Sequence, residues 1–263
     1  MPVTLDEILA TTRRGLPGLH ARGGELESAA RRAPAPPSLR AALGGGSRVA
    51  LVAEVKRRSP SAGVIRQDLK PPERAERYAA AGASAISVLT DEPFFGGSID
   101  DLAAVARRVA VPVLRKDFII DELQVLEARA RGAAAVLLIV RALPAARLAA
   151  LIGCAGDHGL DALVEVHTRA ELERALAAGA TVIGINSRDL DTFRIDVAAA
   201  WALIAAVPAE LVAVAESGMA SAADVARAAA AGADAVLIGT ALSAAADPAA
   251  LAAECTAIAR RGR

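Results

Sequence analysis

Eight short apolar runs recur along the chain, and each is continuous rather than alternating between apolar and polar positions. Continuous apolarity is typical of strands in a parallel sheet that helices cover on both faces. The pattern therefore predicts eight buried parallel strands. They occupy residues 49–55, 85–89, 111–116, 135–140, 162–166, 181–186, 211–217 and 235–239.

Between these runs lie segments rich in Ala, Leu and Arg whose apolar residues recur with a helical period. Thr168, with Glu171 three residues later, is a typical start for one of them. Strand and helix alternate throughout, so we expect right-handed crossovers and a parallel sheet. The clearest predicted helices cover residues 71–81, 121–131, 168–178 and 221–231.

A glycine repeat favours a closed barrel over an open sheet. Gly82, Gly132, Gly179 and Gly232 precede the second, fourth, sixth and eighth predicted strands, at intervals of about 50 residues. Glycine at such a point ends a helix in the left-handed conformation without a Cβ penalty. Eight units of so even a period predict a (β/α)8 TIM barrel rather than a doubly wound open sheet, and 263 residues is an ordinary length for one.

Residues 1–47 stand outside this period. Residues 5–14 and 25–32 have helical patterns, and the stretch APAPPSLRAALGGGS that follows contains helix breakers. We interpret this part as an N-terminal helical extension, either a lid over one barrel mouth or a packing helix, because so few residues cannot easily support their own core. The predicted organisation is a single (β/α)8 barrel domain over residues 1–263, with 1–47 as its extension.

Balanced charge and few aromatic residues narrow the function classes. Lys plus Arg and Asp plus Glu each total 30, so the chain has no general attraction for nucleic acid or an anionic membrane. Aromatic residues make up only 2%, too few to stack the bases of single-stranded nucleic acid. The longest apolar run is far shorter than the roughly 20 residues of a membrane-spanning helix. We expect neither a nucleic-acid nor a membrane partner.

The N-terminal sequence and the spacing of the two cysteines bear on the cellular compartment and on cysteine chemistry. The N-terminal residues contain no basic segment followed by an apolar one, so no secretory signal is predicted and we expect a cytoplasmic protein. Cys154 and Cys255 have no metal-ligand or redox spacing, and we interpret both as buried small hydrophobic residues. For assembly, we expect a monomer or a weak homo-oligomer.

Polar residues gather where the predicted strands end, which is where barrels of this class build their active sites. Glu54 and Lys56 lie two apart and so point to the same side of the first strand. A charge inside a barrel is costly unless it is paired, so the set predicts a polar site, the alternative being a structural ion-pair network or a solvated rim. The other members are Lys116, Glu165, Asn186 and Arg188.

The last two strands end in small residues. Ser217 with Gly218, and Gly239 with Thr240, bring hydroxyls and backbone N–H groups to the common phosphate position of these barrels. Glycine-rich turns also occur for purely steric reasons, but two on adjacent strands favour a phosphate site.

The motifs EVKRRSPSAG, VLTDEPFFGGS, LRKDFIID, LVEVHT, IGINSRDL, VAESGM and VLIGTAL follow one another between Val49 and Leu242. In this order they resemble the motifs of the indole-3-glycerol-phosphate synthase family. The last two occur in looser form in many phosphate-binding barrels, whereas the first and third are much narrower. The resemblance implies conversion of 1-(2-carboxyphenylamino)-1-deoxyribulose 5-phosphate to indole-3-glycerol phosphate in tryptophan biosynthesis, by a carboxy-lyase that needs no metal and no cofactor.

The resemblance also implies roles for the residues at the strand ends. Lys116 is the general acid that protonates the carbonyl as the ring closes, and Glu165 stabilises the developing positive charge or acts as acid or base. Lys56 holds the substrate carboxylate and protonates the departing hydroxyl, while Glu54 is the base of the final aromatising step. Asn186 orients substrate hydroxyls. Lysines gathered out of water lose protons more readily, so we expect lowered lysine pKa values.

The remaining assignments concern binding. Phe94 and Phe95 lie in the loop that the resemblance places over the anthranilate ring, and Phe95 is the predicted contact, with a core role as the alternative. His167 is expected to be a structural histidine and receives no role. The predicted substrate- and phosphate-binding residues are Ser59, Arg188, Ser217, Gly218, Gly239 and Thr240.

The chain departs from the family pattern at three places, and two alternative functions compete with the one implied by the resemblance. Ser187 stands where a second Asn is common, Leu242 is not followed by a Met-Arg pair, and Leu39 replaces an aromatic residue. A phosphoribosylanthranilate isomerase would need a Cys near the end of the first strand, where this chain has Glu54 and Lys56. An inactive paralogue, which would bind a ligand or partner enzymes without turnover, should have lost at least one of Lys56, Lys116 and Glu165, yet all three are present.

Overall fold

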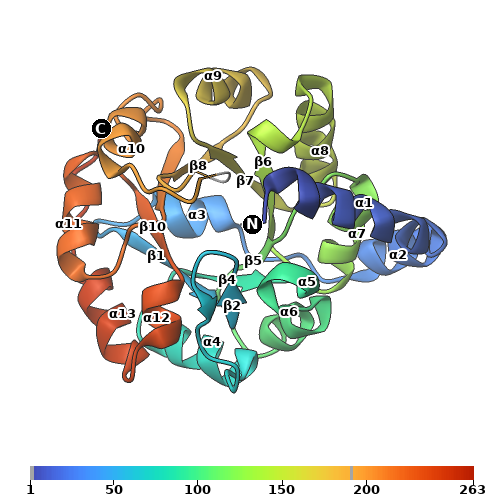
Figure 1. Ribbon diagram of the computed structural model, residues 1–263, viewed down its shortest axis with the longest axis horizontal. Coiled ribbons are helices and arrows are strands. Elements are labelled where there is room, and N and C mark those ends of the chain that lie inside the picture. Colours follow the sequence, from blue (N-terminus) through green and yellow to red (C-terminus); the bar gives the residue numbers. More distant parts are fainter. Residues whose placement is uncertain (1–2, 190–191) are drawn as a thin grey trace.

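The computed structural model describes residues 3–189 and 192–263, so Met1, Pro2, Leu190 and Asp191, which fall in the predicted extension and around the end of the IGINSRDL motif, lie outside the described residues. Eight parallel strands close into one barrel, which confirms the predicted (β/α)8 fold (Figure 1). Their order around the barrel follows the chain. They are β1 (Ala50–Val55), β4 (Ala85–Leu89), β5 (Val113–Lys116), β6 (Ala135–Ile139), β7 (Asp161–Val166), β8 (Val182–Asn186), β9 (Val212–Glu216) and β10 (Ala235–Ile238).

Helices ring the barrel, as Figure 1 shows. Each of the four helices predicted most clearly is present and begins and ends within about one residue of the expected bounds, which is as close as boundary definitions agree. The main helices are α4 (Pro71–Ala80), α6 (Ile99–Ala106), α7 (Glu122–Ala130), α8 (Ala145–Asp157), α9 (Arg169–Ala177), α10 (Val197–Ile204), α11 (Ala222–Ala230) and α13 (Pro248–Thr256). Shorter ones are α5 (Glu92–Phe95), the 3₁₀ turn η1 (Val140–Ala142) and α12 (Thr240–Ala244).

The glycine repeat has the predicted conformation. Gly82, Gly132, Gly179 and Gly232 have φ angles of 93°, 88°, 84° and 97°, in the left-handed region that side chains with a Cβ rarely adopt. Each therefore ends a helix and turns the chain into the next strand.

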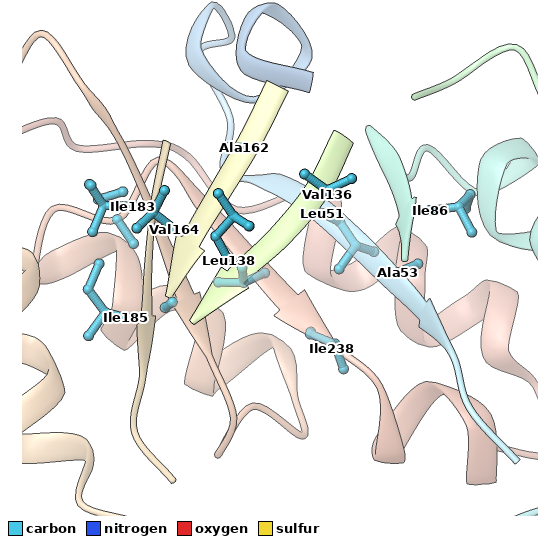
Figure 2. Packing of buried hydrophobic residues seen from close by; sticks show 14 of the residues in the cluster. Leu51, Ala53, Ile86, Val136, Leu138, Ala162, Val164, Ile183, Ile185 and Ile238 are labelled. Atoms are coloured by element: carbon cyan, nitrogen blue, oxygen red, sulfur yellow. The ribbon is translucent and has the colours of Figure 1, made fainter. Parts of the chain in front are cut away.

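Side chains alternate between two hydrophobic layers, because successive residues of a strand point to opposite faces. The outward residues pack under the helices, and Figure 2 shows part of this layer, with Leu51 and Ala53 on β1 and Val136 and Leu138 on β6. The inward residues fill the barrel. They include Val52, Ala85, Leu114, Ala135, Leu137, Leu163, Val182, Val214 and Leu237. Two residues further toward the carboxyl end of several strands, the next inward positions are polar, and they form the site described below.

The N-terminal extension contains three helices: α1 (Leu5–His20), α2 (Gly23–Arg32) and α3 (Leu39–Gly44). The third was not predicted, because it lies inside the stretch that we interpreted as helix-breaking. Leu39 and Leu43, four residues apart on one face of α3, are fully buried against the inward residues at the start of the strands. Helix α3 therefore plugs the N-terminal end of the barrel, whereas α2 packs on α7 through Leu26 and Leu126.

Smaller features differ in part from expectation. Cys255 is buried as predicted, but Cys154 is partly exposed, so that prediction was wrong for Cys154. A two-stranded antiparallel hairpin, β2 (Arg58–Ser59) and β3 (Gly63–Val64), follows β1 and was not predicted. Within the described ranges, none of the helices has the length and apolarity to cross a membrane. The single-domain organisation over residues 1–263 stays a prediction.

Candidate active site

A cavity of about 430 Å³ opens at the carboxyl ends of the barrel strands. Every residue that the sequence analysis assigned to catalysis or binding lines it. Phe94, the alternative aromatic contact, does not appear among the lining residues, whereas Phe95 does, with its ring centroid 6.1 Å from that of Phe118. The lining set comprises Glu54, Lys56, Ser59, Phe95, Lys116, Glu165, Asn186, Arg188, Ser217, Gly218, Gly239 and Thr240, together with Phe118, Glu216 and others.

The two-residue period of the strands explains this convergence. On β1, Val52 points into the barrel, and so Glu54, two positions later, also points inward at the mouth. The same step leads from Leu114 to Lys116 on β5 and from Leu163 to Glu165 on β7. Each strand therefore presents an apolar residue inside the barrel and a polar one above it.

Lys116 stands between two buried carboxylates. Its Nζ lies 2.9 Å from Oε2 of Glu165 and 3.1 Å from Oε2 of Glu216. Asn186 Nδ2 donates to the other Glu165 oxygen, Oε1, at 3.1 Å. Glu165 and Glu216 are 1% and 3% exposed, so water competes little for these contacts and the ammonium is held in one place.

The pKa of Lys116 departs from expectation. Burial by itself would lower that pKa, but the carboxylates of Glu165, Glu216 and Glu54 outweigh burial and raise it above the usual lysine range. The expected lowering is therefore wrong for Lys116, because carboxylates rather than other lysines surround its ammonium.

The two carboxyls beside Lys116 shift in opposite directions. Burial favours the neutral form of Glu165, but Lys116, His167 and Asn186 outweigh burial and hold its pKa below the usual range. At Glu216 burial prevails over the Lys116 charge, the nearby Glu165 carboxylate adds to it, and the pKa rises to about 8. The site thus holds one ionised and one readily protonated carboxyl against the same ammonium.

A second ion pair lies at the carboxyl end of β1. Lys56 Nζ is 2.7 Å from Oε1 of Glu54, and Ser87 donates to Oε2 of Glu54 at 3.4 Å. Gly239 leaves room for this pair, because a Cβ built there would lie 2.1 Å from Glu54 Oε1 and 2.9 Å from Lys56 Nζ. Any larger residue at 239 would push the pair out of position.

The ends of β9 and β10 contribute a cradle of small residues, Ser217, Gly218, Gly239 and Thr240. Ser217 and Gly218 have φ angles of 62° and 69°. The positive φ of Ser217 is unusual for a residue with a side chain, and such strain is concentrated at binding sites. The cradle is lined by hydroxyls and backbone rather than by bulk, which suits an oxyanion.

Two of the other predicted binding residues lie at the rim. Arg188 is fixed by its backbone N–H, which donates to Asn186 Oδ1 at 3.0 Å, and by its guanidinium Nη1, which donates to the Phe193 carbonyl at 3.1 Å. Ser59, on β2, accepts a hydrogen bond from the Ala62 backbone at 3.2 Å. Both side chains therefore border the cavity from segments that follow barrel strands rather than from the barrel itself.

A family model described as indole-3-glycerol phosphate synthase matches residues 5–254 of the chain. The chain belongs to the indole-3-glycerol phosphate synthase family. It is 48% identical over 262 residues to the indole-3-glycerol phosphate synthase of Opitutus terrae, covering 97% of this chain and 98% of that one. The relative of the same name from Chloroherpeton thalassium is 47% identical over 243 residues, covering 90% and 94%.

Solved structures of other proteins resemble this barrel in fold. A 3-hexulose-6-phosphate synthase superposes with a TM-score of 0.66 at 20% identity, covering 80% of this chain and 100% of that chain. A thiamine phosphate pyrophosphorylase from Pyrococcus furiosus superposes with a TM-score of 0.61 at 16% identity, covering 80% and 94%. At such identities the likeness concerns the fold alone.

Among the lining residues that sequence reasoning missed in this indole-3-glycerol phosphate synthase family member, Glu216 and Phe118 bear most on the chemistry. Glu216 was included in the seventh predicted apolar run but not singled out, although Val214 two positions earlier faces inward and the strand period carries that direction to Glu216. Phe118 follows Lys116 by two residues in the LRKDFIID motif, and the same signal would have found it.

The described part of this chain contains no ready set of side-chain ligands for a metal ion. Among residues 3–189 and 192–263, no group of three or more His, Cys, Asp or Glu side chains is arranged to hold a metal ion. The carboxylates of the mouth are instead paired with lysines.

Proposed function

We propose that this chain converts 1-(2-carboxyphenylamino)-1-deoxyribulose 5-phosphate to indole-3-glycerol phosphate, carbon dioxide and water, as a decarboxylating lyase of tryptophan biosynthesis. Membership of the indole-3-glycerol phosphate synthase family supports the assignment. The observation that supports it most directly is the position of the Lys116 ammonium between Glu165 and Glu216. The same cavity also contains the cradle of small residues at the ends of β9 and β10.

Ring closure needs a proton at the carbonyl oxygen. The ring carbon that bears the carboxylate attacks the carbonyl carbon of the sugar chain, a carbon–carbon bond forms, and the carbonyl oxygen takes a proton from Lys116. That oxygen becomes strongly basic as the bond forms, so transfer remains favourable although carboxylates raise the pKa of Lys116. The positive charge that develops on the ring system is stabilised by the Glu165 carboxylate.

The later steps restore aromaticity. Carbon dioxide leaves with its bonding electrons returned to the ring, the new hydroxyl leaves as water with a proton from Lys56, and Glu54 removes the proton from the adjacent carbon. Lys56 and Glu54 are 2.7 Å apart, so the donor and the acceptor of this elimination start as one pair. The whole reaction takes up one proton for each ionised substrate carboxylate.

Binding involves both ends of the cavity. The cradle of Ser217, Gly218, Gly239 and Thr240 would take the phosphate, and Phe95 with Phe118 would cover the anthranilate ring. The other predicted contacts are Asn186 to the sugar hydroxyls and Arg188 and Ser59 to the anionic groups at the rim. The phosphorylated small molecule is the only partner proposed. A cytoplasmic location and a monomer or weak homo-oligomer stay predictions.

The assignment is tested by incubating the purified protein with the carboxyphenylamino substrate and following indole fluorescence. We expect turnover by the natural chain and its loss in Lys116→Met. Lys70→Met is the matched control, because Lys70 is exposed at the start of α4, outside the cavity. Circular dichroism must show that the Lys116→Met variant is folded. Lys116→Arg keeps the positive charge but moves the proton donor, and its turnover provides a second measurement of the role of Lys116. A natural chain that produces no indole product would disprove the proposal.

A further inference from the structure

A histidine with a buried side chain lies next to Glu165 but does not line the cavity. His167 follows β7 directly, its side chain is 5% exposed, and it is absent from the residues that line the cavity. It therefore lies beside Glu165 without bordering the cavity itself. The sequence suggested only a structural histidine here.

One ring nitrogen of His167 is fixed by Glu171 on α9. Nδ1 lies 3.3 Å from Glu171 Oε2, and the same oxygen accepts the His167 backbone N–H at 2.6 Å. Arg141 Nε donates to the other oxygen of Glu171 at 3.1 Å. An ionised Glu171 is only an acceptor, so Nδ1 must carry its hydrogen.

The other ring nitrogen has no such partner. Nε2 is buried and makes no hydrogen bond to any residue in the described ranges, and it lies 3.7 Å from Oε1 of Glu165. That separation is longer than a hydrogen bond, but contacts of catalytic groups are often long in the empty site and shorten when the ligand binds. Because both carboxylates beside the ring are acceptors, only an imidazole protonated on both nitrogens satisfies both of them.

The charges around His167 are consistent with that state. Glu165 faces it from β7 and Glu171 from α9, while Arg141 and Lys116 lie beyond those two carboxylates, and Asp189 pairs with Arg141. The nearest neighbours of the imidazole are thus anions on both sides.

We propose that His167 is a positioning residue that donates from Nε2 to Glu165 Oε1 and keeps this carboxylate ionised and directed at Lys116 during turnover. The proposal rests on the catalytic roles proposed above for Lys116 and Glu165. When Lys116 gives its proton to the substrate, Glu165 loses its cationic partner, and a buried carboxylate without a partner is unfavourable. His167 supplies the second cation for that step. Glu171 holds the ring in the required orientation.

The experiment compares two substitutions of His167. His167→Leu removes the donor, whereas His167→Gln retains an N–H that can point toward Glu165. We expect kcat to fall about 10- to 100-fold in the Leu variant, the range for loss of a group that orients a catalytic residue, with KM nearly unchanged. The Gln variant should recover part of the loss, through the donor that it retains, but not all of it, because it carries no charge. His158→Gln, at the end of α8 and remote from the cavity lining, is the matched control and should leave both constants unchanged.

A merely structural role predicts a different pattern. If His167 only packs, both variants lower the melting temperature while the folded protein keeps its kcat, and the proposal is overturned. Equal losses in Leu and Gln also overturn it, because the donor would then be irrelevant. Should the Leu variant not fold, Glu171→Ala leaves the imidazole in place without its Nδ1 acceptor, and we expect a smaller fall in kcat of the same kind.

A spectroscopic measurement separates this proposal from the proposed function. ¹⁵N NMR of the imidazole in the natural chain should show two protonated nitrogens, and a bare Nε2 would overturn the proposal even if turnover is normal. A natural chain without turnover would instead disprove the function, and the imidazole spectrum would still report on His167. Full turnover with an unaffected Leu variant would disprove only the role of His167.

Discussion

Gly239→Ala adds one methyl group at the point where the second ion pair is packed most closely. The added Cβ would lie 2.1 Å from Glu54 Oε1 and 2.9 Å from Lys56 Nζ. Ordinary contact distances are about 3.5–4.0 Å, so the carboxylate must move by more than about 1 Å. A misplacement of about 1 Å costs on the order of 10²-fold in rate, or about 2.7 kcal/mol of transition-state stabilisation.

The fold should tolerate this change. Gly239 has φ −114°, which any residue adopts, so the backbone is not strained. Overpacking by one methyl group typically costs about 1–3 kcal/mol of stability, and the atoms that must move are ends of side chains. We therefore expect a folded variant with kcat lowered about 10²-fold. KM should also rise, because Gly239 is part of the proposed phosphate cradle.

The assay is steady-state turnover by indole fluorescence, with thermal unfolding measured on the same preparations. Gly153→Ala is the control, since no atom lies within 4 Å of a Cβ built there and the residue is inside α8. That variant should keep full activity and gain about 0.5–1 kcal/mol of stability. A folded Gly239→Ala protein with the natural kcat would refute the reasoning, because the Glu54–Lys56 pair would then not need its present position.

Three further predictions concern stability and binding. The pKa of Glu216 is raised from 4.5 to about 8, chiefly by burial, so the native state retains a proton that the unfolded chain releases between these pH values. The melting temperature should therefore fall as pH rises from 4.5 to 8, and Glu216→Gln should flatten that fall. Ser217→Gly should relieve about 1 kcal/mol of backbone strain at φ 62° while raising KM for the phosphorylated substrate, as thermal unfolding and kinetics will show. Arg263→Ala removes donors to Asp234 and to four backbone carbonyls, and should cost about 2–4 kcal/mol in denaturant unfolding with kcat unchanged.

The fold could be predicted because its two strongest signals are local. A strand covered on both faces must be apolar at every position, and each helix end before an even-numbered strand needs a residue that adopts positive φ. Helix α3 gives neither signal. It has six residues next to prolines and glycines, and it is stabilised by burying Leu39 and Leu43 in the end of the barrel, which is a tertiary contact that periodicity does not reveal.

The site could be predicted as a set of residues but not as an electrostatic arrangement. Strand ends and their two-residue period place Lys116 and Glu165 at one mouth, and would have placed Glu216 there too had the period been applied to β9. Which charge faces which depends on positions around the closed barrel. The expected lowering of the Lys116 pKa was wrong for that reason, since the nearest groups to its ammonium are carboxylates from β7 and β9.

The same alternation of side chains accounts for both stability and chemistry, at opposite ends of one barrel. Inward positions near the start of the strands are apolar and are closed off by Leu39 and Leu43, so the charged positions above them rest on a dry, rigid base. That base keeps water from the lower side of the ion pairs, which strengthens every interaction in the mouth but also makes an unpaired charge there unfavourable. In the proposed mechanism, a proton that moves from Lys116 to the substrate must therefore be matched by other charges already in place. Glu216, whose raised pKa lets it take up a proton, and His167, in the role proposed above, are the groups positioned to do so.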